Sequence, residues 1–144
     1  MGNAMIETAA LILHLCGPGA VHLAPHFERA AHRWHVPPAV LVAVARAEST
    51  CDPDADDGRG DIGIIQVRPG TLAARGHTAA ELHDPRLCLW LGARHLRHWW
   101  GRCGDLAGAL GVYAGHRTCR AGRTSRYAAR VLGFVAEATG EPES

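Results

Sequence analysis

Residues 48–71 read ESTCDPDADDGRGDIGIIQVRPGT, and they follow the almost entirely apolar stretch PAVLVAVARA at 38–47. Pro37-Pro38 restarts the chain with a proline suited to a first helical turn, so we predict a helix that runs to about Glu48. The crowding of Asp, Gly and Pro from Ser49 to Gly63 is typical of a surface loop. The residues of chemical interest therefore lie where this helix meets the loop.

Glu48 is the acidic residue at that junction. Under helical spacing it shares a face with Leu41, Val44 and Ala45, so its carboxyl is expected to point toward the core. Loss of water penalises the ionised carboxylate and raises its pKa, which keeps a proton available. A general acid in glycosidic bond cleavage needs this property. The alternative is a Glu at the end of a helix whose side chain points to solvent and has no catalytic role. The helix alone favours this alternative.

Four motifs in register favour the catalytic interpretation of Glu48 instead. They are Glu48-Ser49, then Asp52-Pro53-Asp54-Ala55, then Asp61-Ile62-Gly63-Ile64-Ile65-Gln66, then Pro69-Gly70-Thr71. This order resembles the soluble lytic transglycosylases and their relatives, the goose-type lysozymes. Asp84-Pro85 with Leu89, Gly92, Ala93 and Leu96 is similar to a further helix of that family. The resemblance covers roughly Val36 to Leu132, and several motifs in register are far more specific than one.

The resemblance implies an all-α, lysozyme-like domain, with α+β and a minimal sheet as the limit, and a glycan-binding cleft. Glu48 would be the acid and later the base in cleaving the β-1,4 bond between MurNAc and GlcNAc of bacterial peptidoglycan, with a 1,6-anhydro-MurNAc product. Ser49 and Gln66 would line and orient the site. Tyr113 matches the family's Tyr only with a one-residue gap, and the neighbouring Asn is missing. Ile65 replaces the usual Met and Cys88 the usual Asn.

A lysozyme-type hydrolase is the alternative reaction. An inverting hydrolase needs a second carboxylate to activate water, roughly 6.5 to 9.5 Å from the first. Asp57 and Asp61 are the candidates, because counting back from Gln66 favours Asp57 and counting forward from Glu48 favours Asp61. A solvated acidic turn is the bland interpretation of both. Two interpretations from other functional classes also remain. One is a catalytically silent glycan-binding or virion or cell-wall scaffold module. The other is a helix-turn-helix DNA binder around Pro37-Pro38.

The rest of the chain predicts further helices. Their expected ranges are 26–34, a short piece from Pro69 to Gly76, a turn or two with a Thr78–Glu81 capping box, 85–100, 106–113 and 127–138. Only 62–67 has the β-branched character of a strand. The predicted organisation is an N-terminal helical segment at 1–23, with Met1–Ala4 as a possible tag remnant before Met5, a catalytic domain at 24–139 and a frayed tail at 140–144.

Composition restricts the partners. The net charge is +1, and no stretch has the roughly 20 uninterrupted apolar residues of a membrane-spanning helix. We expect a monomer that binds peptidoglycan glycan strands outside the cytoplasm, without nucleic acid or membrane insertion. No metal and no cofactor is expected, since no His-Glu-x-x-His motif is present. Cys16, Cys51, Cys88, Cys103 and Cys119 make disulfides plausible, with buried free thiols as the alternative.

Overall fold

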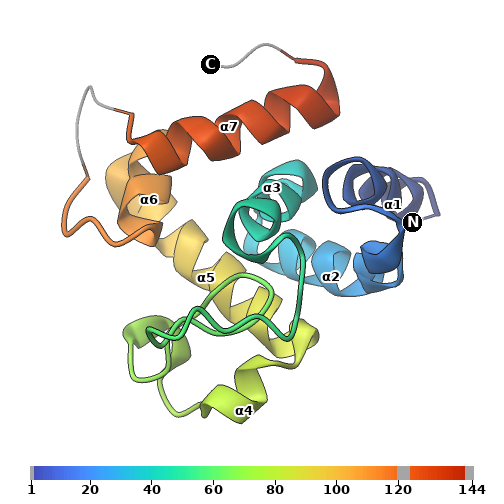
Figure 1. Ribbon diagram of the computed structural model, residues 1–144. Helices are drawn as coiled ribbons and strands as arrows, with labels where there is room; N and C mark the ends of the chain where they lie inside the picture. The colour runs from blue at the N-terminus through green and yellow to red at the C-terminus, as the bar shows by residue number, and fades with distance from the viewer. Residues whose placement is uncertain (1, 120–123, 142–144) are drawn as a thin grey trace.

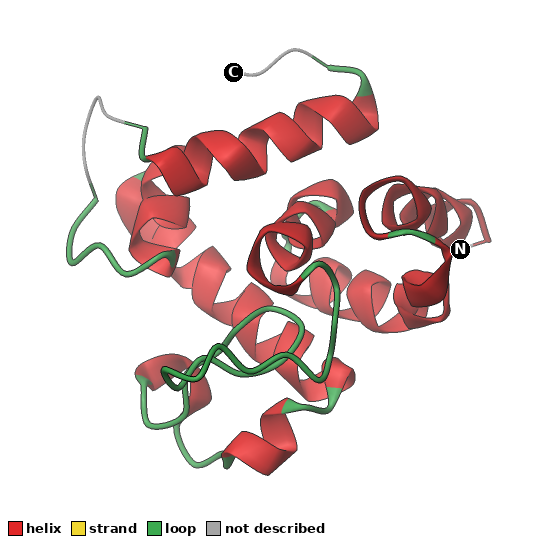
Figure 2. Cartoon of the chain, viewed as in Figure 1, coloured by secondary structure: helices red, strands yellow, loops and turns green. Residues whose placement is uncertain are grey.

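The computed structural model describes residues 2–119 and 124–141, and in these residues the chain is helical with loops between the helices (Figures 1 and 2). The elements in chain order are α1 (Gly2–Cys16), η1 (Pro18–Leu23), α2 (Ala24–Trp34), α3 (Pro38–Ser49), η2 (Leu72–Ala74), α4 (Ala79–Leu82), α5 (Pro85–Cys103), α6 (Leu106–Tyr113) and α7 (Arg126–Thr139). The all-α prediction is confirmed, and the predicted helices fall close to their expected ranges.

Local sequence explains where the helices begin. Proline occupies the first turn of both α3 and α5, where a missing N–H costs nothing. The Asp84 carboxylate caps α5 by accepting from the backbone N–H of Arg86. The capping box predicted for Thr78 and Glu81 is confirmed, because each side chain bonds the backbone of the other residue. The piece expected from Pro69 to Gly76 is shorter, a single 3-10 turn at Leu72–Ala74.

Helix α3 lies at the centre of the fold. Its residues from Val40 to Ala45 are all buried, and it packs against α1, α2 and α7, while α5 packs against α2 and α6 (Figure 1). A helix buried on every side offers no face for a nucleic-acid groove, so the structure does not support the helix-turn-helix interpretation. Because the core packs around α3, this packing also fixes the position of Glu48 near the end of the helix.

Residues 62–67 were predicted to have strand character, and this is wrong. The described residues contain only isolated bridges here, between Ile62 and Val67 and between Asp56 and Ile62. The cause is a tight turn in which Gly63 and Gln66 both take positive φ, at 84° and 54°. Ile62, Ile64, Ile65 and Val67 are buried, so the β-branched run fills the core from a folded loop instead of alternating between two faces.

Two disulfides fix loops to helices. Cys16 at the end of α1 is bonded to Cys51 just after α3, and Cys103 at the end of α5 is bonded to Cys119. The prediction of disulfides is thus confirmed. Cys88 is a buried free thiol, which is the state that the alternative interpretation gave to the cysteines. The first bridge ties the end of α1 to the loop three residues after Glu48.

The N-terminal segment packs on the rest of the chain. Ile12 and Leu15 of α1 belong to the same buried cluster as the residues of α2 and α3. The predicted boundaries at 23 and 139 remain predictions, and Met1 and residues 142–144 of the predicted tail lie outside the described residues. No helix in residues 2–119 and 124–141 is both long and apolar enough to cross a membrane.

Candidate active site

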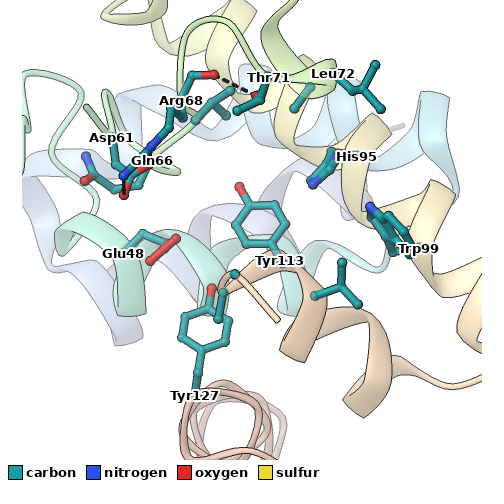
Figure 3. Close-up of a pocket in the computed structure, with 15 residues that line it drawn as sticks. Glu48, Asp61, Gln66, Arg68, Thr71, Leu72, His95, Trp99, Tyr113 and Tyr127 are labelled. Atoms are coloured by element: carbon teal, nitrogen blue, oxygen red, sulfur yellow. Dashed lines mark hydrogen bonds and ion pairs between the residues drawn. The ribbon is translucent and has the colours of Figure 1, made fainter. Parts of the chain in front are cut away.

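A cleft of about 600 Å³ opens beside the end of α3 (Figure 3). Its walls come from the loop after α3, from η2, and from helices α5, α6 and α7. The lining residues are Glu48, Asp61, Gln66, Val67, Arg68, Thr71, Leu72, Ala73, His95, Trp99, Val112, Tyr113, Ala114, Gly115 and Tyr127. Of the predicted site residues, the cleft brings together Glu48, Asp61, Gln66 and Tyr113.

Glu48 points into the cleft from the last turn of α3 (Figure 3). Its pKa is raised from the ordinary value of 4.5 to about 8. The main cause is burial, because a carboxylate loses hydration there, and the negative charges of Asp61 and Asp57 act in the same direction. The Arg130 guanidinium opposes them. At neutral pH the carboxyl therefore holds a proton, as the helix pattern predicted.

Asp61 lies in the cleft wall as half of an ion pair. The Arg68 guanidinium donates from Nε to Oδ1 at 3.1 Å and from Nη2 to Oδ2 at 3.3 Å, a two-point contact. The two side chains are 32% and 50% exposed, so water reaches the pair. Both oxygens of Asp61 are thus directed toward a cation.

Asp57 lies outside the cleft lining. Its Oδ1 accepts the backbone N–H of Arg59 at 2.7 Å and that of Asp61 at 3.1 Å, which closes a turn in the exposed loop. These bonds, the one with Arg59 first, hold the pKa of Asp57 below its ordinary value. Its ionised carboxylate acts on Glu48 only through its field.

Gln66 and Ser49 shape the loop from two sides. The Gln66 amide donates to the carbonyl oxygen of Gly63 at 3.0 Å, and its backbone takes a left-handed conformation that a non-glycine residue seldom adopts. Ser49 Oγ donates to the carbonyl oxygen of Ile64 at 2.6 Å and accepts from the N–H of Asp52 at 3.0 Å. Gln66 lines the cleft, whereas Ser49 lies behind the wall and orients it.

Two tyrosines from neighbouring helices flank Glu48 (Figure 3). Tyr113 of α6 donates from its hydroxyl to the carbonyl oxygen of Ile65 at 2.7 Å, which connects α6 to the loop. Tyr127 of α7 has a buried hydroxyl without a hydrogen-bond partner among the described residues. Burial raises the pKa of both phenols, and the nearby Glu48 adds to this, so both stay protonated. The Tyr127 hydroxyl is consequently a buried donor that no described residue pairs.

Sequence reasoning did not assign most of the other lining residues to the site. Tyr127 was interpreted only as part of an apolar helix stripe, and His95, Arg68 and Leu72 carried no signal that separates a cleft from a surface. Trp99 also lines the cleft, and an indole ring can stack on a sugar. In residues 2–119 and 124–141, no three His, Cys, Asp or Glu side chains are grouped to hold a metal ion.

Comparison with known proteins supplies the family. The transglycosylase SLT domain matches residues 25–130, which is well over half of the chain. A transglycosylase of Enterobacteria phage PRD1 is 33% identical over 86 residues, which are 60% of this chain and 32% of the relative. The match therefore spans about a third of that relative's length. The match to residues 25–130 contains every residue that lines the cleft, and the chain belongs to the transglycosylase SLT domain family.

Proposed function

We propose that the protein is a lytic transglycosylase that cleaves the β-1,4 bond between MurNAc and GlcNAc in bacterial peptidoglycan, with Glu48 as general acid and then base. The observation that carries this proposal is the Glu48 carboxyl, which is protonated at neutral pH and lies in a cleft of about 600 Å³. The family and the phage relative named as a transglycosylase support the same reaction class.

The proposed reaction uses Glu48 twice. Its proton passes to the glycosidic oxygen as the bond to the anomeric carbon of MurNAc breaks, and the acetamido group of the sugar assists at that carbon. The Glu48 carboxylate then takes the proton of the C6 hydroxyl, whose oxygen bonds to the anomeric carbon as the bond between that carbon and the assisting acetamido oxygen breaks. The products are a free GlcNAc end and a 1,6-anhydro-MurNAc end, and Glu48 is protonated again.

The two candidate second carboxylates favour this reaction over hydrolysis. Asp57 is outside the cleft lining, and its Oδ1 holds a loop turn. Asp61 is inside the cleft, but Arg68 contacts both of its oxygens. A general base for water must reach the cleft with an oxygen free to accept a proton. Asp57 does not line the cleft, and Arg68 contacts both oxygens of Asp61, so neither residue is well prepared for that role.

A muramidase that uses Asp61 is the second candidate, because Asp61 shares the cleft with Glu48. Mass spectrometry of digested peptidoglycan distinguishes the two reactions. We expect anhydro-MurNAc ends from the wild type and from Asp61→Asn. Reducing MurNAc ends alone, lost in Asp61→Asn, would instead establish the hydrolase. A protein that binds glycan and releases no fragments would be the silent module.

The proposed place of action is outside the cytoplasm, on the cell wall. The two disulfides support this, because such bonds persist in oxidising compartments. Peptidoglycan strands are the proposed partner, and the monomeric state remains a prediction that light scattering can test.

A further inference from the structure

A second groove of about 450 Å³ lies between α2 and α5. Arg29, Asp84, Arg86, Leu87 and Trp90 line it, and none of them lines the cleft that contains Glu48. The two grooves are thus built from separate residues. A ligand at one leaves the other available.

Two tryptophans order the arginines at this groove. The Arg29 Cζ lies 4.4 Å from the centre of the Trp90 ring, and the Arg33 Cζ lies 4.2 Å from that of Trp34. The two rings meet edge to face, with centres 5.6 Å apart. One face of each indole ring is therefore covered by an arginine side chain, which leaves less of the ring open to stack on a sugar. A guanidinium held over a ring still has N–H donors at its edge that can bind a planar anion.

The arginines of this surface outnumber its carboxylates. Arg29, Arg33 and Arg86 are exposed, and none forms an ion pair with a carboxylate in residues 2–119 and 124–141. Two carboxylates lie nearby, and both accept hydrogen bonds elsewhere. Glu28 accepts from Thr8 Oγ1 at 2.6 Å, and Asp84 caps α5. Three arginines beside Asp84 and Glu28 leave a net positive charge on this surface, and guanidinium N–H donors suit an anionic ligand.

We propose that this α2–α5 surface, defined by Arg29, Arg33, Arg86 and Trp90, binds carboxylates of the peptide stems of peptidoglycan. The inference rests on the proposed function, which makes peptidoglycan the polymer that the enzyme meets. Peptide stems present carboxylates repeatedly along a strand, and a guanidinium contacts a carboxylate at two points. Such a surface holds the enzyme on the wall while the cleft acts on a glycan strand.

Co-sedimentation with purified, teichoic-acid-free sacculi tests the proposal. The full chain carries Glu48→Gln so that the sacculi stay intact, and Arg29→Gln with Arg86→Gln is compared with Arg75→Gln and Arg117→Gln. The control pair removes equal charge from exposed arginines outside both grooves. We expect the first pair to weaken binding about tenfold at low salt and the control to stay within twofold.

Chemical amidation of the sacculi identifies the ligand. On sacculi whose carboxylates are converted to neutral amides, we expect the parent to bind no better than the Arg29→Gln, Arg86→Gln variant. A difference that persists on amidated sacculi, or an equal loss in the control pair, would overturn the proposal. Arg86→Glu alone provides a second variant, because it leaves the two arginine–tryptophan stacks in place.

Failure of this inference and failure of the proposed function give different results. Cleavage is measured separately with the wild type, while binding is measured with Glu48→Gln and needs no turnover. Absent cleavage with intact arginine-dependent binding would refute only the proposed reaction. Intact cleavage with arginine-independent binding would refute only the α2–α5 surface.

Discussion

The hydroxyl of Ser49 donates a hydrogen bond to the backbone carbonyl oxygen of Ile64, at 2.6 Å. This contact joins the end of α3, one residue after Glu48, to the loop that carries Gln66. The acid and the opposite wall of the cleft are thereby fixed relative to each other. The sequence predicted that Ser49 lines the cleft. In the structure Ser49 is not among the lining residues, and it orients the cleft wall through this hydrogen bond.

Ser49→Ala should therefore lower both stability and activity. The buried carbonyl of Ile64 loses its donor, which costs about 1–2 kcal/mol, and the wall becomes free to shift relative to Glu48. Urea unfolding and kcat on peptidoglycan measure the two effects. Thr139→Ala removes an exposed hydroxyl that bonds to Val135, and it should change neither by much. Equal effects of the two changes would show that the Ser49 contact has no special role.

The raised pKa of Glu48 predicts that the pH–rate profile has a basic limb, in which activity falls as the pH rises. The acid must be protonated, so kcat/KM should fall about tenfold for each pH unit above about 8. Asp61→Asn removes a negative charge that raises the pKa of Glu48, and it frees the Arg68 cation, so the limb should move to lower pH. A limb that stays in place or moves to higher pH would contradict this electrostatic assignment.

Glu48 should also make the wild type less stable at high pH. The folded protein holds the Glu48 proton more tightly than the unfolded chain does, so the free energy of unfolding falls as the pH rises from about 4.5 to about 8. Glu48→Gln lacks this titration. We expect the variant to match the wild type near pH 4 and to exceed it at pH 8 by roughly 2 kcal/mol or more. Denaturant unfolding at several pH values checks this, and a gap that does not change with pH would refute it.

Gly63 is required by a close approach as well as by its backbone angle. A Cβ there would collide with the carbonyl oxygen of Leu82 and lie 2.8 Å from the Sγ of Cys88. Gly76 has the same φ of 84° and open space around it. Gly76→Ala should thus cost about 1 kcal/mol, whereas Gly63→Ala should cost about 1–3 kcal/mol more. Thermal unfolding of the two variants measures the difference, and equal losses would exclude the steric contribution.

The sequence predicted the helices and the position of Glu48 because both depend on local periodicity. Proline in the first turn and the apolar face of 38–48 were sufficient for α3. Residues 62–67 were wrongly predicted as a strand because β-branched residues favour strands by composition, whereas the turn depends on positive φ at Gly63 and Gln66, which composition does not show. Tyr127 was missed because α7 meets α3 only in three dimensions. The disulfide pairing was beyond reach for the same reason.

The most direct test of the central claim is cleavage of purified peptidoglycan by Glu48→Gln, with Glu137→Gln as the matched control. Glu137 lies on the exposed surface of α7, paired with His14. Muropeptides released over time are separated by chromatography and identified by mass. We predict that the amount of product released by Glu48→Gln is less than about one thousandth of the wild-type amount, because an essential acid is lost. Glu137→Gln should release the wild-type amount, with anhydro-MurNAc ends. Release by folded Glu48→Gln at a rate near that of the wild type would contradict the assignment of Glu48.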